Sequence, residues 1–322
     1  MRKMVAIAAG GDSAEIEISL LTAQTVYENL DRSRHEGVLV RMVNGKWEAM
    51  LNDSQYPIDK NDFSFTFEGK KIKFDYVFMA IHGTPGEDGK LQAYFDLLNI
   101  PYSSPDHIGA SLTFNKWYCN TLLSQLGFQV ADSVYLRRGE KVNETAILDK
   151  LGLPCFVKPC SCGSSYGISK VKSKEGLFSA IAKAFEFDHE IMVENELKGK
   201  EVTCGVYRKA GKVVPLPITQ IIPEGEFFDY AAKYQGASQE ITPARIKEET
   251  YQKVQQISAD IYEKLNLRGI IRADFMLVND EAYVIELNTV PGMSKNSLVP
   301  QQVAAANINL KDFYNDIIEA TS

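Results

Sequence analysis

The sequence has no run of apolar residues long enough to cross a membrane, because its longest apolar segments are only as long as strands. It also has no excess of positive charge. The 35 lysine and arginine residues against 42 acidic residues give a net charge of -7, which argues against a nucleic-acid partner. The apolar residues after Met1 give way to polar ones from Gly10 onward, so we expect a first strand there rather than a signal peptide. These absences predict a cytoplasmic protein with no membrane partner.

Cysteine and histidine are scarce. Five cysteines, an odd number without secretory context, predict free thiols rather than a disulfide framework. Cys160 and Cys162 have no partners for a zinc site, since the four histidines are scattered singly. The sequence contains no G-x-x-x-x-G-K-[ST] motif, which excludes a P-loop, and no G-x-G-x-x-G motif, which argues against a dinucleotide-binding oxidoreductase.

The first hundred residues alternate strand and helix patterns. A strand at Val5–Ala9 leads into a glycine turn and a helix at Ser19–Leu30, and a buried strand at 75–81 leads into a polar loop and a helix at 91–98. Glu15 and His82 follow the two strand ends. Each alone has an ordinary structural interpretation, but together they mark the carboxyl ends of parallel strands, where open α/β sheets bind ligands.

The middle of the chain predicts a second α/β unit after a boundary at Pro101–Pro105. The residues before that boundary at 60–73 are polar and predict a variable loop. Strands are expected at 154–159 and 190–194, and the first delivers Lys158 into a glycine-serine loop at 160–167. That loop can offer amides and hydroxyls to phosphate oxygens, although such loops are more often simple turns.

The last third predicts a hairpin around Gly211, a long ordered loop or lid at 223–236, helices at 244–265 and 311–320, and a second hairpin within Ile270–Met293. If the second hairpin turns through three residues, Asn279–Glu281, Asp274 lies opposite Glu286 and Arg272 opposite Asn288. Alternation then puts Ala282 and Val284 on the same face as Glu286 and Asn288. Two carboxylates and an amide oxygen beside an arginine suit Mg²⁺ and a transferring phosphate, whereas a solvated strand face is the plain alternative.

The motifs taken together resemble the D-alanine:D-alanine ligases of the ATP-grasp superfamily. The matching residues are Gly10–Glu15, His82-Gly83, Gly86–Gly89, Lys158-Pro159, Gly163–Ser165, Lys233-Tyr234, Arg272-x-Asp274, Glu286-x-Asn288, Pro291–Met293 and Ser297–Pro300. The resemblance implies a three-domain α/β ATP-grasp architecture with a Rossmann-like N-terminal (preATP-grasp) domain. We expect an N-terminal domain at 1–103, a central domain at 104–196 and a C-terminal domain at 197–322, with ATP between the last two.

The resemblance also implies a reaction and a role for each matching residue. The carboxylate of one D-alanine attacks the γ-phosphate of ATP, and the amine of a second D-alanine displaces phosphate from the resulting acylphosphate. The implied catalytic residues are Glu15, Ser164, Arg272, Gly292 and Tyr234; His82, Ser297 and Leu298 bind substrate; Lys116, Lys158, Glu194, Leu197, Glu201 and Lys233 bind ATP; and Asp274, Glu286 and Asn288 hold two Mg²⁺ ions, for which Mn²⁺ can substitute. The family also implies a homodimer.

Two positions bear on the details of this expectation. Asn195 stands where the family often has lysine, so the resemblance leaves that adenine contact open. Tyr234 follows Lys233, as in relatives that use D-alanine as acceptor. The alternatives are a ligase that joins D-alanine to D-lactate or D-serine, and a nucleotide-binding regulator without turnover.

Overall fold

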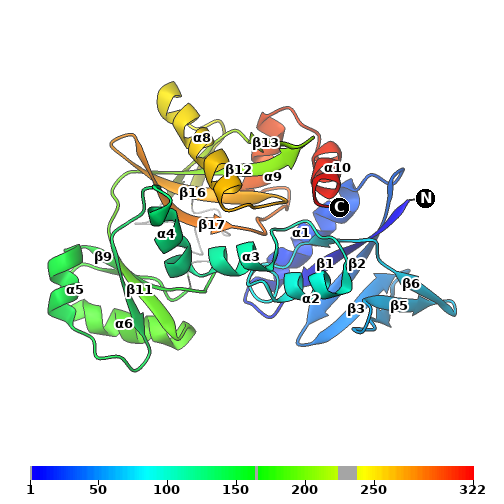
Figure 1. Ribbon diagram of the computed structural model, residues 1–322, viewed down its shortest axis with the longest axis horizontal. Helices are drawn as coiled ribbons and strands as arrows, with labels where there is room; N and C mark the ends of the chain where they lie inside the picture. Colours follow the sequence, from blue (N-terminus) through cyan, green and yellow to red (C-terminus); the bar gives the residue numbers. More distant parts are fainter. Residues whose placement is uncertain (1, 164–165, 224–237) are drawn as a thin grey trace.

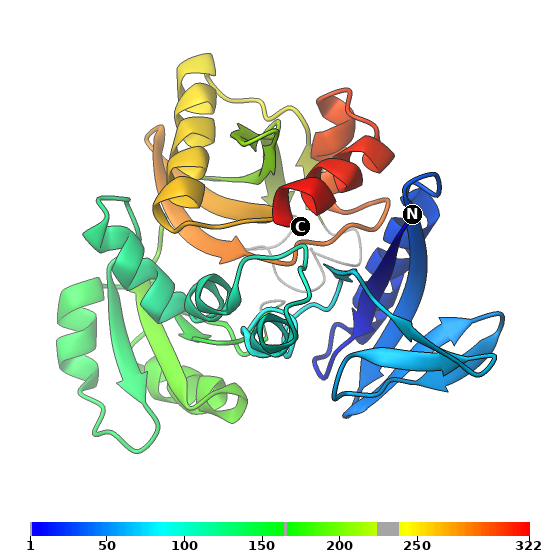
Figure 2. The same ribbon diagram turned by 45° about the vertical axis from the view of Figure 1, so that its right-hand side comes forward.

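A computed structural model describes residues 2–163, 166–223 and 238–322 (Figure 1). The predicted lid at 223–236, apart from Pro223, lies outside the described residues, as do Ser164, Lys233 and Tyr234. The described residues form three main sheets with helices packed against them, and Figure 2 shows the three sheet-bearing parts grouped around a common centre. The α/β architecture expected from the sequence is therefore confirmed.

The first main sheet has the strand order β4-β3-β2-β1-β7. Its strands are β1 (Lys3–Gly10), β2 (His35–Val43), β3 (Lys46–Leu51), β4 (Ser54–Pro57) and β7 (Tyr76–Met79). β1 runs parallel to both β2 and β7, so the ends of β1 and β7 lie side by side as predicted. Helix α1 (Ile16–Asn29) follows β1, and α2 (Lys90–Leu98) follows the loop after β7.

The predicted variable loop at 60–73 is wrong. Residues Ser64–Phe67 and Lys70–Lys73 form an antiparallel hairpin, β5 and β6. Phe63 and Phe65 are buried there, and the ring of Phe63 meets that of Phe95 with centroids 4.9 Å apart. The many polar residues of this segment favoured a loop, but Phe63 and Phe65 are part of the core beside the first sheet.

The second main sheet is antiparallel, with the order β10-β9-β11-β8. Helices α3 (His107–Phe114) and α4 (Lys116–Gln125) lead into it from the first sheet. The side chain of Asn115 accepts hydrogen bonds from the first amides of α4, which sets Lys116 at the start of that helix. The remaining elements are β8 (Ser133–Arg137), α5 (Glu144–Leu151), β9 (Cys155–Pro159), β10 (Ser169–Val171), α6 (Glu175–Phe187) and β11 (Glu190–Asn195).

The third main sheet has the order β15-β14-β12-β16-β17, and β13 pairs with the far end of β12. Its strands are β12 (Lys200–Lys209), β13 (Lys212–Pro215), β14 (Thr219–Pro223), β15 (Ser238–Ile241), β16 (Ile271–Val278) and β17 (Glu281–Asn288). Helix α8 (Glu248–Lys264) covers one face, and its residues Val254 and Ile261 belong to the same buried cluster as Phe275 of β16. The first predicted hairpin is confirmed, but its return segment divides into β13 and β14.

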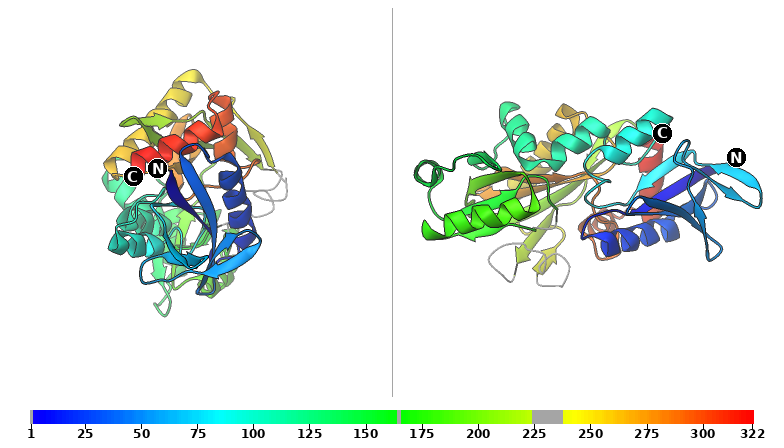
Figure 3. Two further views of the ribbon diagram at one scale, coloured as in Figure 1. Left: turned by 90° about the vertical axis from the view of Figure 1, so that its right-hand side faces the viewer. Right: turned by 90° about the horizontal axis from the view of Figure 1, so that it is seen from below.

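The two ends of the chain share one core. Helices α9 (Leu298–Ala305) and α10 (Leu310–Thr321) close the fold, and Figure 3 shows α10 lying beside the N-terminal strands. Phe313 and Tyr314 of α10 belong to the same buried cluster as Ile7 and Phe78 of the first sheet. All five cysteines are free thiols, as predicted. No helix in the described part of the chain combines the length and the apolar character needed to cross a membrane.

Candidate active site

The β16–β17 hairpin has the predicted cross-strand pairs, but its turn is shorter than predicted and β17 carries a bulge. Val278 pairs with Glu281, so the turn has two residues rather than three, and Asn279 and Asp280 both have positive φ values (51° and 66°) as the favoured two-residue turns require. A bulge beside Asp274 then adds one residue, Ile285, to β17. The bulge restores the register, so that Asp274 lies opposite Glu286 and Arg272 opposite Asn288, as predicted.

The bulge also changes which side chains share a face. Ala282 and Val284 are buried in the core beneath α8, whereas Glu286 and Asn288 are partly exposed away from it. The prediction that these four residues share one face is therefore wrong, because strict alternation fails where a strand carries an extra residue. After the bulge, the side chains of Glu286 and Asn288 point away from the core.

Asp274 is buried within a set of donors. Arg272 donates to both of its carboxylate oxygens at 2.8 Å, and Asn288 Nδ2 donates at 2.9 Å. The hydroxyl of Thr203, on the neighbouring strand β12, donates to Oδ1 at 2.5 Å. A buried carboxylate needs such partners, and this set fixes Arg272 and Asn288 on the same face of the sheet.

Glu286, the cross-strand partner of Asp274, meets a charge from another part of the fold. Lys116 Nζ lies 3.3 Å from Glu286 Oε2 and donates to the carbonyl oxygen of Cys162 at 2.8 Å. Burial alone would lower the pKa of Lys116, but the Glu286 carboxylate outweighs it and the pKa is raised. Lys116 therefore stays charged and bridges the third sheet and the loop after β9.

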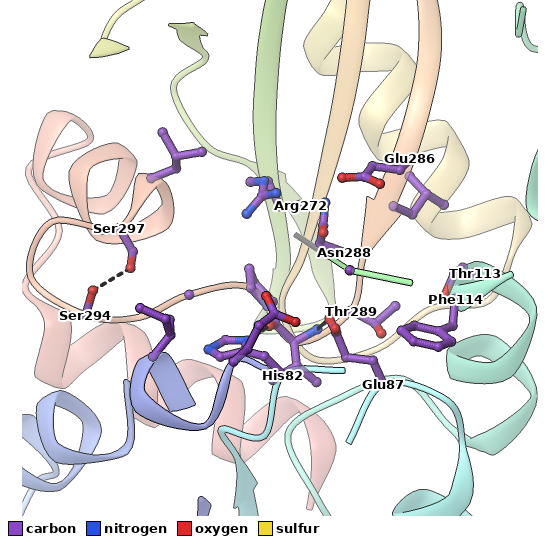
Figure 4. Close-up of a pocket in the computed structure, with 18 of the residues that line it drawn as sticks. His82, Glu87, Thr113, Phe114, Arg272, Glu286, Asn288, Thr289, Ser294 and Ser297 are labelled. Atoms are coloured by element: carbon purple, nitrogen blue, oxygen red, sulfur yellow. Dashed lines mark hydrogen bonds between the residues drawn. The ribbon is translucent and has the colours of Figure 1, made fainter. Parts of the chain in front are cut away.

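Arg272, Glu286, Asn288 and Lys116 line a cavity of about 300 Å³. The labelled side chains in Figure 4 show that it is lined from the first and the third sheet and by α3. Nine of the residues predicted for the site lie in its wall: Glu15, His82, Lys116, Arg272, Glu286, Asn288, Gly292, Ser297 and Leu298.

Glu15 is buried at the start of α1 and faces the loop after β9. A Cβ atom on Gly163 would lie 2.8 Å from Glu15 Oε2, so a side chain at this position would require the Glu15 carboxylate to move. The predicted partner Ser164, next along the chain, lies outside the described residues.

His82 is buried and uses both ring nitrogens within the protein. Nδ1 lies 2.8 Å from the carbonyl oxygen of Val290, and Nε2 lies 3.1 Å from the hydroxyl of Thr22. Burial lowers the pKa of His82, which favours the neutral ring. The histidine joins the first sheet to the segment after β17, and its predicted contact with substrate stays a prediction.

The residues predicted for ATP lie mainly on the second sheet. Lys158 of β9 and Glu194 of β11 form a buried ion pair between adjacent antiparallel strands. Leu197 lies in the short crossover between β11 and β12, and Glu201 lies on β12 opposite Met276. These four residues and Asp274 stand outside the cavity lining.

The segment after β17 leads into the N-terminus of α9. Ser297 is the N-cap residue, and its hydroxyl lies 2.7 Å from that of Ser294 instead of capping a helix amide. Leu298 is the first helical residue of α9, a helix whose bounds were not predicted from the sequence. Gly292 lines the cavity beside Ser297. Helix amides free of side-chain caps suit an anion such as a carboxylate.

Two acidic residues of the cavity wall were missed as site residues. Burial raises the pKa of Glu87 to about 7, and the nearby charge of Glu15 acts in the same direction. Burial also raises the pKa of Glu240, which accepts a hydrogen bond from Gln301 Nε2 at 2.6 Å. Glu87 belongs to a motif that the sequence did reveal, whereas Glu240 has no signal of its own there.

Comparisons with known proteins show the family to which this fold belongs. The family model described as "D-ala D-ala ligase N-terminus" matches residues 4–105, and "D-ala D-ala ligase C-terminus" matches residues 122–319. A D-alanine--D-alanine ligase from Phocaeicola vulgatus is 48% identical over 321 residues, with 99% of both chains covered. One from Flavobacterium johnsoniae is 48% identical over 318 residues, with 98% of both covered.

Solved structures of similar enzymes share the fold. The D-alanine-D-alanine ligase from Coxiella burnetii has a TM-score of 0.89 at 25% identity, covering 99% of this chain and 93% of its own. The VanG D-Ala:D-Ser ligase from Enterococcus faecalis has a TM-score of 0.87 at 29% identity, with 99% of both covered. A Bacillus anthracis D-alanine--D-alanine ligase complexed with ATP has a TM-score of 0.79 at 30% identity, covering 99% and 97%.

The fold and the site define an ADP-forming carboxylate–amine ligase of the ATP-grasp type. Within that class, the chain belongs to the D-alanine–D-alanine ligase family. The activity that defines the family is the ATP-dependent joining of two D-alanine molecules for peptidoglycan synthesis.

Proposed function

We propose that the 300 Å³ cavity is where this chain joins two D-alanine molecules. The observation that carries the proposal is the convergence of Glu15 from the start of α1, Lys116 from α4 and Arg272 from the third sheet on one cavity. Glu15, with Ser164, would hold the ammonium group of the first D-alanine, because a buried carboxylate is a natural partner for a cation. His82 would support this subsite.

ATP would lie against the second sheet, with its phosphates pointing toward the cavity. The buried Lys158–Glu194 pair offers a donor and an acceptor to the adenine side, while Leu197 and Glu201 extend this surface toward β12. Lys116 lies between the loop after β9 and Glu286, a position that suits a phosphate oxygen. Lys233 would add a second positive charge to the phosphates.

Asp274, Glu286 and Asn288 would hold two Mg²⁺ ions, with Mn²⁺ as a substitute. No three His, Cys, Asp or Glu side chains gather into a metal-binding group anywhere in residues 2–163, 166–223 and 238–322. The donor set still fits, because Mg²⁺ binds proteins through one or two carboxylates and takes further ligands from phosphate and water. Asn288 donates to Asp274 through Nδ2, so the Oδ1 atom of Asn288 would be the one available to a metal ion. The ions would neutralise charge on the transferring phosphate.

The reaction would proceed in two displacements. A carboxylate oxygen of the first D-alanine forms a bond to the γ-phosphorus, and the bond to ADP breaks. The amine nitrogen of the second D-alanine then attacks the carbonyl carbon, loses a proton and expels phosphate. Arg272 and the amide of Gly292 would stabilise the negative charge that develops on the oxygen of the tetrahedral intermediate.

The acceptor D-alanine would place its carboxylate at the N-terminus of α9, beside Ser297 and Leu298. Tyr234 would complete the site and favours an amine acceptor over D-lactate.

A coupled assay tests this proposal. Phosphate release should require ATP, Mg²⁺ and D-alanine together, and D-alanyl-D-alanine should be the dominant product when D-alanine competes with equal D-serine or D-lactate near neutral pH. Equal yields of the mixed products would contradict the acceptor assignment, and ATP binding without D-alanine-dependent turnover would favour the regulator.

A homodimer in the cytoplasm is the setting we propose for this activity. Leu97 of α2 and Ile108 of α3 are 83% and 65% exposed, and exposed apolar residues on neighbouring helices suit a subunit contact. Light scattering of the purified chain should give twice the mass of 36.0 kDa.

A further inference from the structure

A hydrogen-bonded chain connects the first domain to residues 290–293. The carbonyl oxygen of Val290 can only accept, so His82 Nδ1 carries a hydrogen and donates to it at 2.8 Å. Nε2 of the neutral ring then accepts from the Thr22 hydroxyl at 3.1 Å. The Thr22 oxygen in turn accepts from the amide of Met293 at 3.3 Å.

Glu87 makes the second connection, and Figure 4 shows it in the cavity wall with His82 and Thr289. Oε1 accepts from the amide of Val290 at 3.1 Å, and Oε2 accepts from the amide of Gly83 at 2.8 Å. Gly83 has a φ of 67°, a conformation that favours glycine. Both oxygens are thus used by backbone donors, one from each side of the contact.

Three backbone groups around Gly292 are held in this way: the N–H and C=O of Val290 and the N–H of Met293. The short path Val290–Met293 is therefore fixed at both ends by side chains of the first domain. We propose that Glu87 and Thr22 are positioning residues that, through these bonds, hold the Gly292 amide at the reacting carboxyl group. The inference rests on the proposed role of Gly292 in stabilising the intermediate.

The positioning role predicts a loss of turnover without loss of ATP binding. Removing Glu87 leaves the buried amide of Val290 without its acceptor, and misplacing a catalytic donor by about 1 Å can cost up to about 100-fold in rate. We expect kcat to fall at least about 10-fold in Glu87→Ala and about 3- to 10-fold in Glu87→Gln and Thr22→Val. Glu87→Gln keeps one acceptor oxygen, so it should lie between wild type and Glu87→Ala. The KM for ATP should change less than about 2-fold, because the proposed nucleotide surface on the second sheet is separate.

Hydrogen exchange of the free enzyme at pH 8 provides a readout that is independent of catalysis. Peptides covering residues 288–294 should exchange faster than in wild type in Glu87→Ala, where the Val290 amide loses its acceptor, and in Thr22→Val, where the Met293 amide does. Glu87→Gln should exchange at a rate between those of wild type and Glu87→Ala. Asp88→Asn is the matched control: Asp88 is on the same loop but bonds to Thr84 and Lys90, so both readouts should stay at wild-type values.

The outcomes separate this inference from the proposed function. Faster exchange together with reduced kcat supports the positioning role. Unchanged exchange, or faster exchange with wild-type kcat, overturns it while wild type still releases phosphate with D-alanine. A wild-type enzyme without D-alanine-dependent phosphate release contradicts the proposed function itself. Thr22→Val keeps the shape of the side chain, so it preserves the test if Glu87→Ala fails to fold.

Discussion

Glu286 is paired with Lys116, whereas Asp274 is paired with Arg272. The pairing of Glu286 predicts how a mutation there will change kcat. Glu286→Gln removes the charge that faces Lys116 and the proposed metal ions but keeps the shape of the side chain. We expect kcat to fall at least about 100-fold, because the charge would act directly on the metal ions that neutralise the transferring phosphate. Steady-state phosphate release at saturating Mg²⁺ measures the effect.

The same strand offers a control for that mutation. Glu281→Gln removes an exposed carboxylate that pairs with Lys253 at 2.5 Å, far along β17 from the cavity lining. Its kcat should stay within about 2-fold of wild type, since exposed ion pairs contribute little. Near-normal turnover in Glu286→Gln would contradict the proposal that Glu286 binds a metal ion.

Glu87 should make stability depend on pH. Its pKa is raised by burial to about 7 in the folded protein, against an ordinary value of 4.5, so the folded state binds this proton more tightly than the unfolded chain does. The resulting stabilisation, up to about 3 kcal/mol, is complete below pH 4.5 and is lost as the pH rises through 7. The midpoint of thermal unfolding should therefore fall more steeply between pH 5.5 and 8.5 in wild type than in Glu87→Gln. Identical slopes would contradict this account.

Single residues were predictable where a motif carried the chemistry. Arg272, Asp274, Glu286 and Asn288 could be placed together because pairing geometry follows from a hairpin pattern. Glu240 could not, since its approach to Gln301 depends on β15 meeting α9, which are far apart in sequence. His82 was predicted at the right place, but its two internal hydrogen bonds depend on residues 60 and 208 positions away.

The β16–β17 hairpin shows what pattern alone can say about an element. Two strands and their cross-strand pairs were predictable from composition and spacing, yet the two-residue turn and the bulge were not. Both arrangements give the same partners at Asp274, because a shorter turn and an extra strand residue offset one another. Burial explains why the bulge is there. Ala282 and Val284 face the core beneath α8, whereas the charged Glu286 faces away from it, and one extra residue between them allows both.

The turn of this hairpin yields a stability prediction. Asp280 has a φ of 66°, and a β-branched side chain is strongly disfavoured in that conformation. Asp280→Val should destabilise the protein by about 1–2 kcal/mol, measured by thermal unfolding, with little effect on kcat. Asp280→Gly is the matched control, because it loses the same exposed contact with Lys247 but tolerates the positive φ. Equal losses in both variants would assign the effect to the ion pair instead.

At the scale of the whole molecule, the main feature hidden from the sequence is that α10 completes the core of the first sheet. A terminal helix was predictable from its pattern, but its partner was not, because the two are separated by more than 200 residues. The ring of Tyr314 meets that of Phe78 edge-on with centroids 5.4 Å apart, and the hydroxyl of Tyr76 lies 2.5 Å from that of Thr321. The first sheet therefore depends on the far end of the chain for part of its core.

This dependence can be measured with the two tryptophans. Trp47 lies on β3 of the first sheet and Trp117 on α4, so Trp117→Phe leaves Trp47 as the sole tryptophan, whose emission excited at 295 nm reports on the first sheet. In that background, Tyr314→Ala should lower the unfolding midpoint reported by Trp47, because deleting a buried aromatic ring costs about 3–5 kcal/mol and its cavity would open against Phe78. Tyr118→Ala, at a tyrosine that is 42% exposed on α4, should leave this midpoint near its starting value. If the Trp47 midpoint is the same with and without Tyr314, the first sheet folds without α10; if it falls, the two ends of the chain unfold as one cooperative unit.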